Sequence, residues 1–160
     1  MSIFLSVSKI VKGQSIIEFG CGEGDVSRKL AFQGYDVTPI DIADNCLSKG
    51  SKLFFDGKFI RTDFTEGIDV TADFGFSVDT MEHIPPDRVD DAIDVILKSC
   101  KKSFFQICTM PDGYGGRIKE TLHLSIHDYV WWQDKFIEHG ATIFHGKKQQ
   151  SHIILFVGIE

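Results

Sequence analysis

The residues with the clearest chemical content form the run Glu18-Phe19-Gly20-Cys21-Gly22-Glu23-Gly24, which follows two apolar residues. Three glycines at alternate positions come directly after what is typical of a buried strand, and a carboxylate stands two residues ahead of the first glycine. Glycine lacks a Cβ atom, so the chain can turn tightly there and a ligand can approach the main chain closely. The pattern predicts a ligand-binding loop at the end of a strand.

Further candidate groups follow later apolar runs. Asp41 ends one such run, Asp63 follows another, and Asp79-Thr80-Met81-Glu82-His83-Ile84-Pro85 comes after Phe74–Val78. His83 is the best candidate for a general base, because histidine titrates near neutrality and could take a proton from a hydroxyl. The alternative is that Glu82 and His83 only orient this loop and cap the next helix. His123 is a second catalytic candidate.

These groups must be positioned by strands that alternate with helices. The expected strands are Ser15–Phe19, Asp36–Ile40, Lys58–Thr62, Phe74–Val78, Ser103–Thr109, Thr142–Phe144 and Ile153–Ile159. The expected helices are Asp25–Phe32, Cys46–Leu53, one from Pro85-Pro86-Asp87 to Cys100, and one that stops at Gly140. The pattern predicts an α/β fold with a mostly parallel sheet, helices on both faces and a C-terminal antiparallel hairpin. Ligands of such sheets bind at the carboxyl ends of the strands.

Two segments near the end of the chain carry their own predictions. Ser125-Ile126-His127-Asp128 has the form of a capping box, which would open the helix that contains Trp131 and Trp132. The glycine-rich loop Pro111–Arg117 follows the fifth expected strand, and Tyr114 and Arg117 are its large side chains. We interpret it as a lid over an acceptor site, with an ordinary flexible connection as the alternative.

Composition limits the class of protein. The chain has 160 residues, which suits a single domain spanning residues 1–160. No apolar run approaches the length of a membrane span, and no signal peptide is apparent, so we expect a cytoplasmic protein. The net charge of −6 argues against a nucleic-acid partner. The four cysteines form no Cys-x-x-Cys pair, so we predict neither a disulfide nor a metal site.

The glycine spacing distinguishes between two nucleotide ligands. The dinucleotide fingerprint is Gly-x-Gly-x-x-Gly, but here Asp25 stands where its third glycine belongs. The run from Glu18 to Gly24 instead resembles motif I of the class I S-adenosylmethionine-dependent methyltransferases, which is acidic-x-Gly-x-Gly-x-Gly. The resemblance continues in register at Asp41, Asp63 and the Asp79–Pro85 segment, and it covers nearly the whole chain. It implies a Rossmann-like methyltransferase fold with a seven-stranded sheet.

The resemblance also implies roles for individual residues. Asp41 would bind the ribose hydroxyls, Asp63 the adenine amino group, and Glu18 would serve the amino end of the cofactor through water or the loop backbone. Asp63 could alternatively only cap the turn Thr62–Gly67. The remaining cofactor contacts would come from an apolar slot and from backbone that lines the methionine portion, namely Ile42, Phe64, Gly20, Cys21, Gly22, Asp79, Thr80 and Met81.

These observations predict an S-adenosylmethionine-dependent methyltransferase that acts on an oxygen or nitrogen of a small molecule or saccharide and releases S-adenosylhomocysteine. A non-catalytic cofactor-binding regulatory or partner subunit is the alternative, and an NAD-dependent dehydrogenase is a weaker one. Only about 14 residues precede the first expected strand, so we expect the usual N-terminal helix over the pocket to be mostly missing. The acceptor site would then be open, or closed by a second copy or a partner subunit.

Overall fold

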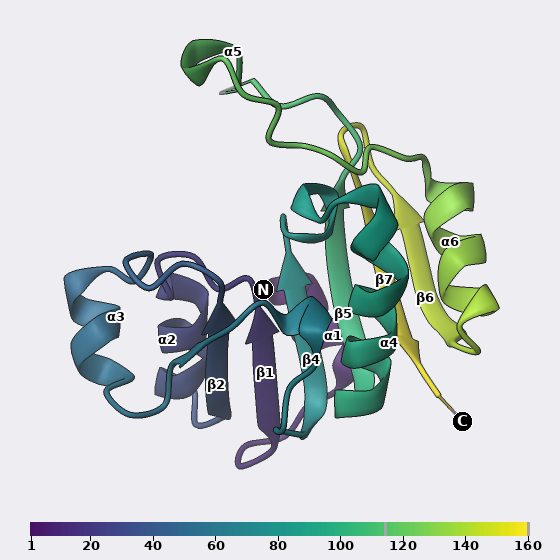
Figure 1. Ribbon diagram of the computed structural model, residues 1–160. Coiled ribbons are helices and arrows are strands. Elements are labelled where there is room, and N and C mark those ends of the chain that lie inside the picture. Colours follow the sequence, from purple (N-terminus) through teal and green to yellow (C-terminus); the bar gives the residue numbers. More distant parts are fainter. Residues whose placement is uncertain (114, 160) are drawn as a thin grey trace.

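The computed structural model describes residues 1–113 and 115–159, and its centre is a seven-stranded sheet (Figure 1). The strands are β1 (Ser15–Phe19), β2 (Asp36–Asp41), β3 (Ile60–Arg61), β4 (Ala72–Val78), β5 (Cys100–Cys108), β6 (Thr142–Lys148) and β7 (His152–Gly158). Their order across the sheet is β3-β2-β1-β4-β5-β7-β6. Strands β1 to β5 pair in parallel, whereas β7 runs antiparallel to both of its neighbours. The predicted α/β fold and terminal hairpin are confirmed.

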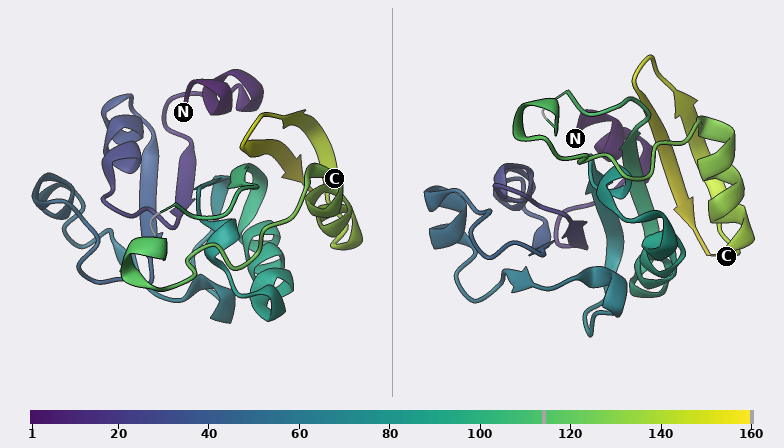
Figure 2. Two further views of the ribbon diagram at one scale, coloured as in Figure 1. Left: turned by 90° about the horizontal axis from the view of Figure 1, so that it is seen from above. Right: turned by 45° about the horizontal axis from the view of Figure 1, so that its top comes forward.

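Helices cover both faces of the sheet, as the views in Figure 2 show. They are α1 (Ser2–Ser8), α2 (Asp25–Phe32), α3 (Lys49–Phe54), α4 (Val89–Ser99), α5 (Gly115–Ile118) and α6 (Tyr129–Glu138). Three short 3-10 turns follow strand ends: η1 (Phe64–Glu66), η2 (Met81–His83) and η3 (Pro86–Arg88). The apolar side chains of α4 and α6 pack on one face with Ile17 and Phe19, whereas Leu30 of α2 packs on the other with Ile16. This alternation along β1 follows from the two-residue period of a strand.

The first residues of the chain form helix α1, which was not among the helices expected from the sequence. Helix α1 places Phe4, which is 0% exposed, edge-on against Phe74, Phe76 and Phe104. Burial of a whole aromatic ring in such a cluster stabilises the packing of a helix of only seven residues. The helix therefore covers the face of the sheet that also carries α2, and it does not line the cavity described below.

The predicted capping box at Ser125–Asp128 is wrong. Helix α6 begins at Tyr129, and its cap is Asp128, whose carboxylate accepts a hydrogen bond from the Trp131 amide. The hydroxyl of Ser125 is buried instead and donates to the carbonyl oxygen of Ile84 at 2.7 Å. Of the residues that match the capping pattern, Asp128 caps the helix alone, and Ser125 makes a contact with a distant segment. In the same helix Trp132 is fully buried, as core packing requires.

The strand order positions the ligand site. The chain passes from β1 to β2 and β3 on one side and returns to β4 and β5 on the other, so the order reverses between β1 and β4. Loops leave the carboxyl ends of these two strands in opposite directions, which opens a crevice between them. The glycine loop after β1 and the Asp79–Pro85 segment after β4 both lie at this edge. None of the described helices is long and apolar enough to cross a membrane.

Candidate functional site

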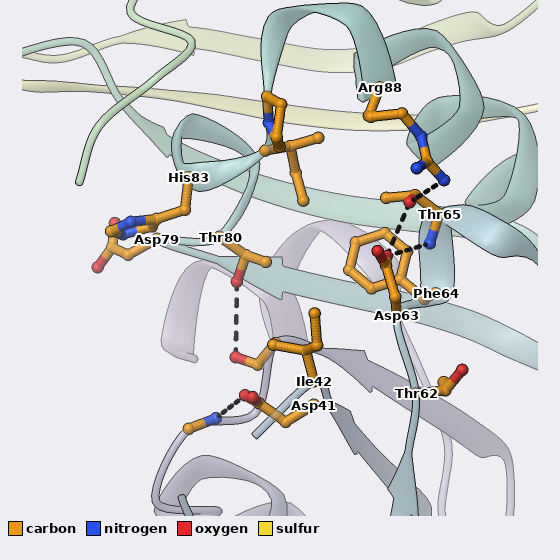
Figure 3. A pocket seen from close by; sticks show the side chains of 14 residues that line it. Asp41, Ile42, Thr62, Asp63, Phe64, Thr65, Asp79, Thr80, His83 and Arg88 are labelled. Atoms are coloured by element: carbon orange, nitrogen blue, oxygen red, sulfur yellow. Dashed lines mark hydrogen bonds between the residues drawn. The ribbon is translucent and has the colours of Figure 1, made fainter. Parts of the chain in front are cut away.

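A cavity of about 470 Å³ opens at the carboxyl ends of β1, β2 and β4 (Figure 3). Its walls come from loops that follow four different strands, which is the arrangement expected at the reversal of strand order. The lining residues are Gly20, Gly22, Asp41, Ile42, Thr62, Asp63, Phe64, Thr65, Asp79, Thr80, His83, Ile84, Pro85 and Arg88. Eight of the eleven residues that the sequence assigned to a cofactor are in this set.

The three glycines of the loop are needed for different reasons. All three have positive φ angles, of 72° at Gly20, 49° at Gly22 and 73° at Gly24. A Cβ atom at Gly20 would lie 2.4 Å from the side chain of Thr80, and one at Gly24 would lie 2.8 Å from Leu47. A Cβ atom at Gly22 would meet no atom within 4 Å among the described residues. Of the three, Gly22 is therefore the glycine that leaves space for a ligand.

Asp41 joins the glycine loop to the end of β2. Its carboxylate accepts hydrogen bonds from the Gly22 amide at 2.8 Å and from the Ala43 amide at 3.0 Å, one on each oxygen. Each carboxylate oxygen can accept a second hydrogen bond, so these two backbone contacts orient the side chain and leave capacity for a ligand. The neighbouring Ile42 side chain lines the cavity with 64% of its surface exposed.

Asp63 is the N-cap of η1 and also lines the cavity. Its Oδ1 atom accepts from the amide of Thr65 at 3.0 Å and from the hydroxyl of Thr65 at 2.7 Å. Arg88 donates from Nη2 to the same hydroxyl oxygen at 2.7 Å, so the three side chains form a chain across one wall (Figure 3). The two interpretations of Asp63 are therefore compatible, because one carboxylate oxygen caps the turn while the residue still faces the cavity.

The loop after β4 is held in an unusual conformation. Asp79 has a φ angle of 53°, although it has a Cβ atom, and its carboxylate lies 3.2 Å from Nε2 of His152. Thr80 donates from its hydroxyl to the carbonyl oxygen of Phe19 at 3.2 Å, which ties the ends of β1 and β4 together. A left-handed residue other than glycine is strained and persists where surrounding contacts hold it, which is frequent at ligand sites.

Three residues assigned to the cofactor are not among those that line the cavity. Glu18 is buried in β1, where the hydroxyl of Ser27 donates to its carboxylate, and burial raises its pKa to about 7. Cys21 uses its backbone amide to donate to the carbonyl oxygen of Ile40 at 2.9 Å, and burial raises the pKa of its thiol well above the usual range. The Met81 side chain is fully buried in the core. None of the three lines the cavity.

The two histidines that the sequence singled out lie together, 40 positions apart in the chain. Their rings meet edge to face with centroids 4.8 Å apart. Nδ1 of His83 lies 2.9 Å from the carbonyl oxygen of Leu122, and Nδ1 of His123 lies 2.7 Å from that of Met110. Burial lowers the pKa of His83, and the neighbouring His123 lowers it further. The neutral form of the His83 ring is therefore favoured.

A second cavity, of about 320 Å³, adjoins this pair. It is lined by Pro111, Asp112, Gly115, Lys119, Glu120, Thr121, Leu122, His123 and Ile126. His83 belongs to the first cavity and His123 to the second, so the histidine pair stands between them. The Pro111–Arg117 loop contributes to the second cavity and leads into α5, whereas Tyr114 lies outside the described residues.

Sequence reasoning missed several lining residues: Thr62, Thr65, Ile84, Pro85 and Arg88. Ile84 and Pro85 belong to the segment that carried the resemblance, so a signal was present. Arg88 carried no such signal, because it reaches the cavity wall only through its bond to a threonine 23 residues earlier.

Comparison with known proteins identifies the family. A family profile described as a methyltransferase domain matches residues 16–103, more than half of the chain. The chain belongs to this family and is a class I S-adenosylmethionine-dependent methyltransferase, which confirms the resemblance of the glycine loop. It is an enzyme, and S-adenosylmethionine is its methyl donor. The non-catalytic and NAD-dependent alternatives are therefore set aside.

Solved structures share the fold. Magnesium protoporphyrin IX methyltransferase from Synechocystis PCC 6803, with bound S-adenosylhomocysteine, superposes with a TM-score of 0.77 at 15% identity, covering 99% of this chain and 79% of that one. A TehB-like methyltransferase from Corynebacterium glutamicum gives 0.75 at 17% identity, covering 98% and 85%. A methyltransferase from Clostridium acetobutylicum gives 0.76 at 12%, covering 99% and 88%. None of the curated protein sequences compared with this chain matches it.

Proposed function

We propose that this methyltransferase transfers its methyl group to an oxygen or nitrogen atom of a small molecule or saccharide. The observation that carries the proposal is the position of the His83–His123 pair, with the donor cavity on one side and a second cavity on the other. Two imidazole rings between donor and acceptor can act on the proton-bearing atom of an acceptor. The volume of the second cavity, about 320 Å³, suits a small molecule or a single sugar.

The first cavity fits the methyl donor chemically. Asp41 has carboxylate oxygens with remaining acceptor capacity, which suits the two hydroxyls of a ribose. Exposed Ile42 and the buried Phe64, which also lines the cavity, supply apolar surface for an adenine, and Asp63 stands at the same end as a hydrogen-bond acceptor. Gly22 leaves its main chain open to the cavity, as the methionine portion requires. We assign these five residues to the donor, with Gly20, Asp79 and Thr80 shaping the same wall.

When bound, S-adenosylmethionine supplies an electrophilic methyl group on a sulfonium. The acceptor atom forms a bond to the methyl carbon, the carbon–sulfur bond breaks, and its electron pair stays on sulfur in S-adenosylhomocysteine. The acceptor atom also loses a proton, which must leave the site. The protein contributes mainly by holding the two reactants in line, since proximity and orientation supply most of what a methyl transfer needs. His83 and His123 act at the acceptor, at the point where its proton is lost.

The position of the Pro111–Arg117 loop supports a role for it as a lid over the acceptor site. Pro111, Asp112 and Gly115 line the second cavity, so the loop already forms part of its wall. Figure 1 shows that α5, which continues the loop, projects beyond the carboxyl ends of the strands. We propose that Tyr114 and Arg117 contact the acceptor. Unchanged turnover and acceptor affinity in both Tyr114→Ala and Arg117→Ala would reject the lid.

The proposed function is tested by binding and turnover. Calorimetry with S-adenosylmethionine, S-adenosylhomocysteine and NAD should show binding of both sulfur nucleotides and none of NAD. A panel of hydroxylated and amino-bearing small molecules and sugars, scored by release of S-adenosylhomocysteine, should then give turnover that His83→Ala and His123→Ala abolish. Turnover with oligonucleotides but with none of the small acceptors would overturn the proposal. A cytoplasmic location and a second copy or partner that closes the acceptor site stay predictions.

A further inference from the structure

Three side chains with metal-ligating atoms converge at the boundary of the two cavities. The Glu82 carboxylate and one ring nitrogen from each of His83 and His123 all lie within 4.8 Å of one another. Ligand atoms around a tetrahedral zinc ion, with bonds of about 2.0–2.2 Å, are about 3.4 Å apart, so small side-chain rotations would close this set onto an ion. Two imidazoles and one carboxylate form a recognised ligand set of catalytic zinc sites, in which a fourth position stays open.

The Glu82 carboxylate is the strongest sign that something binds here. The residue is 0% exposed, and its Oε1 atom accepts from the amide of Cys108 at 3.2 Å. Its Oε2 atom has no hydrogen-bond partner among residues 1–113 and 115–159. A fully buried carboxylate oxygen without a partner is rare in folded proteins and calls for an explanation such as a bound ion. Its inclusion in the ligand set with both histidines supplies that explanation.

Both histidine rings make the kind of hydrogen bond that metal-binding histidines make through the nitrogen that does not bind the ion. The carbonyl oxygens of Leu122 and Met110 can only accept hydrogen bonds, so Nδ1 of each ring must carry the proton. Nε2 of each ring is then the nitrogen with a free lone pair. Metal-binding histidines almost always donate their other ring N–H group to a carbonyl or carboxylate in this way, which fixes the tautomer and the ring orientation.

Backbone hydrogen bonds hold the two segments in register. The carbonyl oxygen of Glu82 accepts from the amides of Leu124 and Ser125 at 2.7 and 2.9 Å. The buried hydroxyl of Ser125 donates to the carbonyl oxygen of Ile84. Together with the bond from His83 to Leu122, these contacts form what we call the 82–84/122–125 junction. The junction places His123 beside His83, although no secondary structure connects the two segments.

From this geometry we infer that Glu82, His83 and His123 bind one divalent transition-metal ion of the zinc class, through a carboxylate oxygen and the two Nε2 atoms. The local charge agrees, because Asp79 and Asp112 also act electrostatically on His83. Nitrogen ligands favour zinc, cobalt or a similar ion over magnesium, which prefers oxygen ligands in an octahedron. The sequence predicted no metal site from its cysteines, and this inference departs from that prediction.

The inference deepens the proposed function and rests on it for the role of the ion. An acceptor hydroxyl oxygen that enters the second cavity can occupy the open position of the ion. The ion then makes the hydroxyl more acidic, the proton is released to water, and the oxygen forms the bond to the methyl carbon as described above. In this arrangement His83 and His123 serve as ligands, and neither takes the proton itself.

The ligand atoms of a second cluster, Cys21, Asp41 and Cys46, also lie within 4.8 Å of one another. The side chains of this cluster, however, are not arranged to bind a metal ion. Both Asp41 oxygens already accept backbone amides, and the Cys21 thiol points its hydrogen toward the carbonyl oxygen of Gly22 at 3.7 Å. Thiols bind metals only as thiolates, and burial disfavours that form here. It therefore carries no metal proposal.

Cobalt(II) titration tests the inference, because cobalt replaces zinc and its visible absorption reports the ligands. The full chain is used without a histidine tag and after removal of metals by a chelator. We expect one equivalent of Co²⁺ to bind with a visible spectrum, zinc to displace it, and magnesium to leave it in place. His83→Ala, His123→Ala and Glu82→Gln should each weaken binding by more than about tenfold. His145→Ala, on strand β6 at the far edge of the sheet, is the matched control and should bind as the wild type does.

The outcomes separate this inference from the proposed function. If the wild type binds Co²⁺ no better than His123→Ala, or if His145→Ala loses as much affinity, the metal site is wrong. His123 lies on a surface segment, and its variant is checked for folding by its melting temperature, so loss of the site can be told from loss of the fold. Binding of S-adenosylhomocysteine is measured in the presence of chelator. If it binds without metal while Co²⁺ does not bind, the metal site fails and the donor site stands; the reverse result rejects the donor site.

Discussion

The donor side and the acceptor side of this methyltransferase are built in different ways. On the donor side, Gly22, Asp41 and Asp63 each lie within three residues of the end of a strand, and hydrogen bonds to nearby amides orient the two carboxylates. On the acceptor side, the Glu82–His83 segment meets His123 only through the 82–84/122–125 junction. The first side depends on strand order, and the second depends on contacts between segments about 40 residues apart.

This contrast shows which part of the site is fixed by the sheet and which part can vary from one acceptor to another. Strand ends of an α/β sheet are fixed by the whole core, so a donor site placed on them is rigid. A segment held by a few hydrogen bonds can change without disturbing the sheet, which is how one fold can serve many acceptors. If the two sides are as independent as the geometry indicates, a variant on one side should leave ligand binding on the other side unchanged.

The largest expected effect concerns Glu18, which is buried in β1 just ahead of the donor loop and accepts a hydrogen bond from Ser27 of α2. Burial raises its folded-state pKa to about 7 from 4.5, while the hydroxyl of Ser27 and the amino group of Met1 oppose the shift. The folded state therefore retains a proton that the unfolded state has lost, and stability falls as the pH rises from about 4.5 to about 7. Glu18→Gln should reduce this fall, on the order of 1 kcal/mol per pH unit, in urea unfolding at several pH values. Glu23→Gln, at an exposed position, should leave it unchanged.

The second prediction compares two glycines within the donor loop. Gly20→Ala should lower the free energy of unfolding by at least about 2 kcal/mol, because its Cβ atom would collide with Thr80 as well as adopt a positive φ. Gly22→Ala should cost only about 1 kcal/mol in stability, since its Cβ atom enters open space. Its main effect should instead be weaker binding of S-adenosylhomocysteine. Equal effects of the two variants on both quantities would contradict the different roles of these glycines.

The third prediction separates donor binding from acceptor chemistry. Asp41→Ala should weaken binding of S-adenosylhomocysteine by about 2 kcal/mol, because the ribose hydroxyls lose their acceptor, and should leave Co²⁺ binding unchanged. Asp44→Ala removes an exposed carboxylate that pairs with Arg61 and is the matched control. A loss below about 1 kcal/mol at Asp41 by calorimetry would count against its role.

The donor side was largely predictable from sequence because its information is local. The positions of β1 and α2 were predicted with their observed bounds, since an apolar run followed by alternate glycines leaves few alternatives. Asp41 and Asp63 followed from the ends of the next strands. The role of Glu18 through water or the loop backbone stays a prediction, and what the sequence did not indicate is that its side chain lies buried against α2 with Ser27.

On the acceptor side, the sequence identified some of the residues but did not show how they come together. His83 and His123 were singled out by residue type, yet nothing in their spacing shows that their rings would meet. Ser125 was assigned to a helix cap, because a capping pattern and a buried tertiary hydrogen bond use the same residue types. Which one forms depends on whether Ile84 is near, and that is a property of the folded chain. Helix α1 was missed for a similar reason, since the burial of Phe4 against three distant phenylalanines outweighs its short length.

The smallest expected effect is at Ser125 and tests the junction directly. Ser125→Ala removes the donor to the Ile84 carbonyl oxygen and should lower the free energy of unfolding by about 1 kcal/mol. Because the junction aligns His123 with His83, Co²⁺ affinity and turnover should both fall, while affinity for S-adenosylhomocysteine should stay at the wild-type value. Ser77→Ala is the matched control: this serine is equally buried, but its hydroxyl has no partner in the described part of the chain. If Ser125→Ala weakened donor binding as much as metal binding, the two sides would have to be treated as one coupled site. The loss of a single hydrogen bond on the acceptor side would then lower affinity equally on both sides.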